Sequence, residues 1–69
     1  MEVFDLGDRE YIQLNDLLKV MGLRTSGGAA KAAIAEGLVR VDGDVELRKR
    51  CKIRKGQSIE FNGQKVVVK

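Results

Sequence analysis

The residues with the clearest chemical potential form a basic cluster, residues 48–55, in which six of eight positions are Lys or Arg and none is acidic. Cations at this density can neutralise phosphates and release condensed counterions, which gives affinity that falls as salt rises. The alternative is an ordinary solvated face that favours solubility. We favour phosphate contact because the cluster is dense. Its candidate ligands are Arg48, Lys49, Arg50, Lys52 and Arg54.

A second candidate anion site is the segment Thr-Ser-Gly-Gly-Ala-Ala-Lys at residues 25–31. Thr25 and Ser26 can cap a helix, whose first backbone N–H groups carry partial positive charge. The glycines would let a phosphate approach closely, and Lys31 would add a full charge. Taken alone, the segment is better explained as a plain helix cap. It lacks the Gly-x-x-x-x-Gly-Lys-[Ser/Thr] spacing of a nucleotide-binding loop.

Residues for catalysis and for metal binding are scarce. The chain has no His and one Cys, Cys51, which excludes Cys/His zinc sites, His acid–base chemistry and an intramolecular disulfide. Cys51 falls in the apolar phase of an expected strand, so we interpret it as a small core residue. The alternating acids Asp42, Asp44 and Glu46 lack the length of a calcium loop and predict a surface turn. We therefore expect no enzyme, no metal and no cofactor.

Length and composition predict one small domain over residues 1–69. The chain is 43% hydrophobic and 33% charged, which is a globular composition. No basic segment leads into an apolar one at the N-terminus, and the longest apolar run, residues 32–35, is far too short to span a bilayer. We expect a soluble, cytoplasmic monomer with no membrane partner.

Charge is distributed unevenly along the chain. Residues 1–23 hold two basic and five acidic side chains, a net charge of −3, whereas residues 24–69 hold eleven basic and five acidic ones, a net charge of +6. Such asymmetry in a small domain indicates a polyanionic partner. The acidic N-terminal part could instead fold over the basic cluster and mask it.

Two helices must position these residues. Over residues 13–21 the apolar side chains recur at i, i+3, i+4 and i+7, and Gly22 can end that helix; they are Leu14, Leu17, Leu18 and Met21. Its start is less clear, because Gln13 is a poor cap. An Ala-rich second helix is expected over about residues 27–36. Its buried stripe would consist of Ala30, Ala33, Ile34 and Gly37.

After the second helix, apolar residues recur at every second position, which predicts strands. Residues 39–41, 51–54 and 59–61 alternate, and residues 65–68 form a further strand candidate. Asp42-Gly43 and Asn62-Gly63 are tight-turn signals, and the second is the stronger. Residues 3–6 could add a short N-terminal strand. The sequence predicts an α+β fold, with two helices packed on a small antiparallel sheet.

The stretch from residue 26 to residue 43 resembles the core signature of the S-four-like RNA-binding domain, the alpha-L motif. The family pattern is Ser-Arg-x-x-Ala-[Lys/Arg]-x-x-Ile-x-x-Gly-x-Val-x-Val-[Asn/Asp]-Gly. Matching residues in register are Ser26, Ala30, Lys31, Ile34, Gly37, Val39, Val41, Asp42 and Gly43. Leu14 and Leu17 match the first-helix leucines, and Gly56 and Ile59 match a later element. In its small size and its basic cluster, the chain is most similar to stand-alone bacterial members of this family.

The resemblance implies an RNA-binding surface formed by the two helices and an adjoining strand and loop. Residues to which it assigns RNA binding are Lys31, Arg48, Lys49, Arg50 and Lys52. Ser26 would be a helix cap or phosphate contact, and Arg24 and Arg54 are further candidates. Gly27 stands where the family usually has Arg, so one phosphate-binding side chain is missing there.

We therefore predict a non-catalytic module for structured RNA, such as ribosomal or translation-linked RNA. Recognition would use shape and phosphates, because the major groove of A-form RNA is too deep and narrow to read. Aromatic residues are few, and Tyr11 is the only plausible exposed residue for base stacking. The alternative is a protein-interaction adaptor that docks its basic face on an acidic partner in the ribosome or RNA-processing machinery. DNA binding rests on the same charges but lacks a recognition helix.

Overall fold

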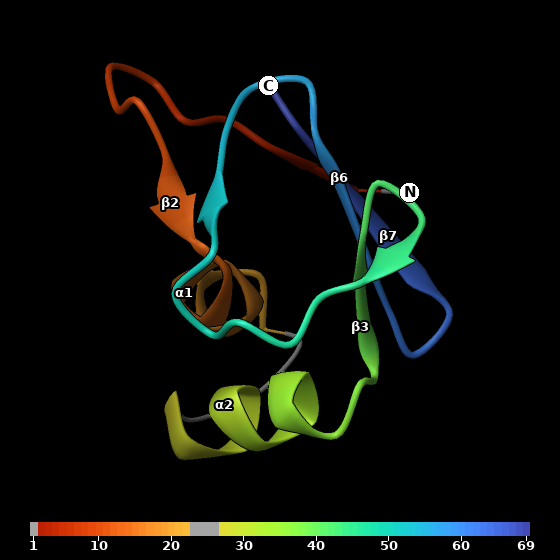
Figure 1. Ribbon diagram of the computed structural model, residues 1–69. Coiled ribbons are helices and arrows are strands. Elements are labelled where there is room, and N and C mark those ends of the chain that lie inside the picture. Colours follow the sequence, from red (N-terminus) through yellow and green to blue (C-terminus); the bar gives the residue numbers. More distant parts are fainter. Residues whose placement is uncertain (1, 23–26) are drawn as a thin grey trace.

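The structure, a computed structural model, describes residues 2–22 and 27–69. Two helices and seven short strands follow one another in these residues (Figure 1). Their order is β1 (Glu2–Phe4), β2 (Ile12–Gln13), α1 (Leu14–Val20), α2 (Gly27–Ala35), β3 (Val39–Val41), β4 (Asp44–Val45), β5 (Lys52–Ile53), β6 (Ser58–Phe61) and β7 (Gln64–Val68). The expected α+β class, the two helices and the N-terminal strand are confirmed.

The main sheet has five strands in the order β1-β7-β6-β3-β4. The strands β3, β4, β6 and β7 pair antiparallel, as expected, but β1 pairs with β7 in parallel, with Val3 opposite Val67. The sheet is therefore mixed, which corrects the expectation of a wholly antiparallel one. Parallel neighbours need a long crossover connection. Here the strands lie at opposite ends of the chain, so everything between them serves as that crossover.

Both predicted tight turns are present. Asp42 and Gly43 have φ angles of 52° and 90° and join β3 to β4, while Asn62 and Gly63 have φ angles of 53° and 78° and join β6 to β7. Positive φ at both central residues is the geometry that matches the twist of a two-residue hairpin. The side chain of Asp42 also links the first turn to β6, because its Oδ1 accepts a 2.9 Å hydrogen bond from the backbone N–H of Ser58.

The core lies between the five-stranded sheet and the helices, which sit on the same side of it (Figure 1). The predicted inner residues Ala30, Ala33 and Ile34 of α2 are fully buried, whereas Gly37 is half-buried. The core is aliphatic apart from two Phe rings. Its members are Phe4, Leu6, Ile12, Leu14, Leu17, Leu18, Ala30, Ala33, Ile34, Val39, Ile53, Ile59, Phe61, Val66 and Val68.

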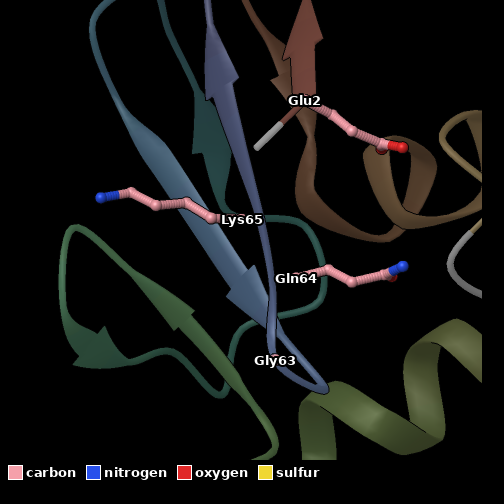
Figure 2. A pocket seen from close by; sticks show the side chains of 4 residues that line it. All are labelled: Glu2, Gly63, Gln64 and Lys65. Carbon is pink, nitrogen blue, oxygen red and sulfur yellow. The ribbon is translucent and has the colours of Figure 1, made fainter.

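The other face of the sheet is open, and its charges alternate. In Figure 2, Glu2 and Gln64 point to the helix side while Lys65 points to the opposite side. Across the open face, Glu60 stands between Arg40 on β3 and Lys65 on β7. Opposite charges on adjacent strands are favourable. Cations on this face therefore have acidic neighbours, unlike most of the basic cluster.

A separate two-stranded sheet, β2 with β5, holds the basic cluster against α1 (Figure 1). Residues 51–54 were expected as a strand, but β5 does not join the main sheet. It pairs with β2, a two-residue strand that the sequence did not predict. This pairing buries Ile12 opposite Ile53.

The loop before β5 also caps α1. The side chain of the N-cap residue Gln13 makes no capping hydrogen bond. Instead, the N–H of Leu14 donates to the carbonyl of Cys51 at 2.9 Å, and that of Asn15 donates to the carbonyl of Lys49 at 3.0 Å. The first N–H groups of a helix have no partner within the helix, so these bonds satisfy donors that would otherwise be lost.

We expect the amides of Leu14 and Asn15 to exchange with solvent slowly, because tertiary carbonyls cap them. Hydrogen exchange followed by NMR measures this directly, and their protection should approach that of Leu18 in the same helix. Fast exchange of both amides, as for an uncapped helix start, would show that the loop does not hold α1 in solution.

Two glycines should respond oppositely to replacement by alanine. Gly37 has a φ of 77°, and an added Cβ would make only ordinary contacts, the nearest at 3.7 Å to Val45, so Gly37→Ala should cost about 1 kcal/mol through backbone strain alone. Gly28 lies in α2 with open space around its Cα, so Gly28→Ala should stabilise the fold by about 0.5 kcal/mol. Urea unfolding of both variants tests the pair, and shifts of the same sign would contradict it.

Candidate nucleic-acid interface

The basic cluster (residues 48–55) is presented on a firmly anchored loop and strand. The backbone of Lys49 and Cys51 is bonded to α1, and the side chain of Ile53 is fully buried. Strand alternation then turns Lys52 and Arg54 away from the core, as predicted. All of the predicted ligands in the cluster are solvent-exposed: Arg48, Lys49, Arg50, Lys52 and Arg54. The fold thus fixes the backbone of the cluster while its cationic side chains are exposed to solvent.

A hollow of about 400 Å³ lies on this surface, lined by Arg48, Arg50, Cys51 and Lys52. Three of the four lining side chains are cations, so the hollow is suited to an anion. The fourth, Cys51, is half-buried and packs against the core. Burial raises the pKa of its thiol, with a further contribution from the nearby Glu46 carboxylate. The thiol therefore stays protonated at neutral pH and is a poor nucleophile.

Arg48 differs from the other cations because it already has an acidic partner. Its Nε donates to Glu46 Oε2 at 2.9 Å, its Nη2 donates to Oε1 at 3.1 Å, and its backbone N–H donates to Oε2 at 3.0 Å. These hydrogen bonds lower the pKa of Glu46 to about 2, so the carboxylate is charged throughout the neutral range. A bidentate carboxylate occupies the donors that a phosphate would use. This competition was not predicted from the sequence, because Glu46 lies outside the run of cations.

Lys52 and Arg54 instead share an aromatic partner, Tyr11. The Lys52 Nζ lies 5.0 Å and the Arg54 Cζ 5.7 Å from the centroid of the Tyr11 ring. Both distances fall within the range of cation–π attraction. The sequence singled out Tyr11 as a base-stacking candidate but not as a neighbour of these cations, because nothing in it predicted the pairing of β2 with β5.

The remaining predicted ligands are not part of this group. Arg24 and Ser26 lie outside the described residues. Lys31 is exposed on α2, and α1 stands between α2 and β5 (Figure 1). The structure thus brings together the ligands of the basic cluster and leaves Lys31 on a different element.

The acidic side chains of the N-terminal part make no ion pair with the basic cluster in the described residues. Asp5 accepts a 2.8 Å hydrogen bond from the N–H of Gly7, and within residues 2–22 and 27–69 the one ion pair joins Arg48 to Glu46. The acidic N-terminal part therefore does not mask the cluster through ion pairs in the described structure. The same residues contain no group of three or more His, Cys, Asp or Glu that could hold a metal ion. No helix among them is long and apolar enough to cross a membrane.

Comparison with known proteins gives strong matches over almost the whole chain. Residues 4–69 match the family model of the S4 domain. The protein YbcJ of Escherichia coli (strain K12) is 54% identical over 68 residues, which cover 99% of this chain and 97% of YbcJ. YbcJ of Shigella flexneri matches with the same identity and coverage.

Solved structures agree with these sequence matches. The solution structure of E. coli YbcJ, described as revealing an alpha-L motif involved in RNA binding, has a TM-score of 0.76 and covers 99% of this chain and 86% of that one. The crystal structure of the 30S ribosomal protein S4e from Thermoplasma acidophilum has a TM-score of 0.59 at 28% identity, covering 81% of this chain and 29% of that one. The resemblance read from the sequence is confirmed, and this chain belongs to the S4 domain family.

Proposed function

We propose that this protein is a non-catalytic module that binds structured RNA through its phosphates, with the basic cluster as the main contact. The observation that carries the proposal is the anchoring of this cluster. Its backbone is bonded to α1 and paired with β2, while its cations are exposed on and beside a hollow of about 400 Å³. Binding then requires little ordering of the backbone, which lowers its entropic cost.

The relatives support the same class of ligand. The motif seen in YbcJ is one involved in RNA binding, and the S4e protein is part of a 30S ribosomal subunit. We propose ribosomal or another translation-linked RNA as the target. The described residues offer few aromatic rings for stacking on unpaired bases, whereas helical RNA presents phosphates and 2′-hydroxyls over a wide, shallow minor groove. Helical RNA therefore fits this surface better than a single strand.

The test is a fluorescence-anisotropy titration of a labelled RNA hairpin at several salt concentrations, with a DNA duplex of the same sequence as competitor. The wild-type protein should prefer the RNA. Lys49→Ala/Arg50→Ala should weaken binding and reduce the slope of log affinity against log salt by roughly two, because two phosphate contacts are lost. The backbone carbonyl of Lys49 is unaffected by this change, so α1 keeps its cap.

Lys65→Ala is the control for general charge. Lys65 is exposed on the open face of the five-stranded sheet, beside Glu60 and away from β5 (Figure 2). It should leave both affinity and slope nearly unchanged. Equal, weak binding to RNA and DNA, or an unchanged slope in the folded Lys49→Ala/Arg50→Ala variant, would overturn the proposal and favour an acidic protein partner.

The Glu46 carboxylate should compete with RNA phosphates for the Arg48 guanidinium. In Glu46→Gln the carboxylate charge is lost while the shape is kept, so Arg48 becomes available to a phosphate. We expect RNA affinity to rise by about twofold to fivefold at low salt and the salt slope to steepen by about one. Glu60→Gln removes the same charge on the open face and is the matched control. Equal gains in RNA affinity in the two variants would show that the change in net charge alone explains the effect.

A further inference from the structure

We propose that, within the basic cluster, Lys52 and Arg54 form a phosphate-binding site with Tyr11, in which the Tyr11 ring positions the two cations for the RNA backbone. This inference rests on the proposed function, because its ligand is a pair of neighbouring phosphates in the same RNA. Tyr11 is a positioning residue here, since it acts through the two cations.

The site follows from the register of the small sheet. Ile12 pairs with Ile53 and Gln13 with Lys52, so the next position places Tyr11 beside Arg54. Ile12 and Ile53 point into the core, and alternation puts the side chains of Tyr11, Lys52 and Arg54 on the outer face. Tyr11 is half-buried while both cations are exposed. A half-buried ring thus lies next to two exposed cationic side chains.

An aromatic ring can restrain a cationic side chain without adding the negative charge that an acidic partner would bring. Long Lys and Arg side chains lose rotamer freedom when they bind, at a cost in free energy. A carboxylate can hold a cation in place, as Glu46 holds Arg48, but it also neutralises the charge that a phosphate needs. The face of an aromatic ring attracts a cation through its quadrupole and carries no net charge. The ring therefore restrains Lys52 and Arg54 without placing a negative charge beside them.

The same geometry argues against Tyr11 as a base-stacking residue. The cationic ends of Lys52 and Arg54 lie 5.0 Å and 5.7 Å from the ring centroid, within the region that a stacked base would need. A base would have to displace at least one of them. Phosphate contact requires no such displacement, because both charges already point into solvent.

The proposal is tested by changing the electronics of the ring while keeping its shape. Tyr11→Phe keeps the negative face of the ring and is the reference variant for this comparison. Tyr11→pentafluorophenylalanine, made by chemical synthesis of the chain, reverses the quadrupole in a similar volume. We expect its affinity to fall about threefold to tenfold relative to Tyr11→Phe, with the salt slope unchanged, because no charge is lost.

A double-mutant cycle shows whether Tyr11 acts through the cations. Lys52→Ala/Arg54→Ala should lower the salt slope by roughly two, and in that background the Phe and pentafluorophenylalanine variants should bind equally. Circular dichroism of every variant confirms that the fold is retained. A structural role for the ring would persist in this background, because it does not depend on the cations.

Three results would overturn the inference. The first is equal RNA affinity of the Phe and pentafluorophenylalanine variants in the otherwise wild-type chain. The second is an affinity difference that persists after both cations are removed. The third is a difference that occurs only with RNA carrying an unpaired base, which would indicate stacking. Failure of the proposed function is a separate outcome, since Tyr11→Phe and the wild type would then show no preference for the RNA.

Discussion

The amide groups at the start of α1 need acceptors, and the way the chain supplies them shapes the rest of the surface. Gln13 provides no side-chain cap, so the carbonyls of Lys49 and Cys51 accept these hydrogen bonds. An unsatisfied N–H at a helix end would be costly in a chain this small. The capping bonds therefore fix the path of the loop, and Ile53 then anchors the strand that follows. Because the loop uses its backbone carbonyls to cap the helix, its cationic side chains remain exposed to solvent.

Cations of the described residues differ in the side chains beside them, and net charge alone does not distinguish them. On the open face of the sheet, Arg40 and Lys65 flank Glu60. Arg48 is held by the Glu46 carboxylate, whereas Lys52 and Arg54 lie over the Tyr11 ring. The exposed cations of the basic cluster other than Arg48 therefore lie on or beside the small β2–β5 sheet without a carboxylate partner in the described residues.

Much of the fold could be predicted from local pattern. The leucine spacing of the first helix, the alanine-rich second helix and the two turns with positive φ all depend on residues close together in the chain. The strand β5 lies within the predicted strand at residues 51–54, but its pairing with β2 could not be predicted, because the two-residue β2 is too short to show a period. For the same reason Tyr11 was identified only as an exposed ring. Its cations lie some forty positions further along the chain, and the contact depends on the register of β2 against β5.

The sequence by itself determined the α+β class, the core residues of both helices, the hairpins and the presence of a dense cationic run. These features follow from apolar period, turn chemistry and charge, which are local properties. Tertiary structure decided that β1 pairs in parallel with β7 at the edge of the sheet and that a distant loop caps α1. It also decided which cations lie beside a carboxylate and which lie over an aromatic ring. Such choices depend on satisfying backbone donors and burying apolar side chains across the whole chain. No local segment contains that information.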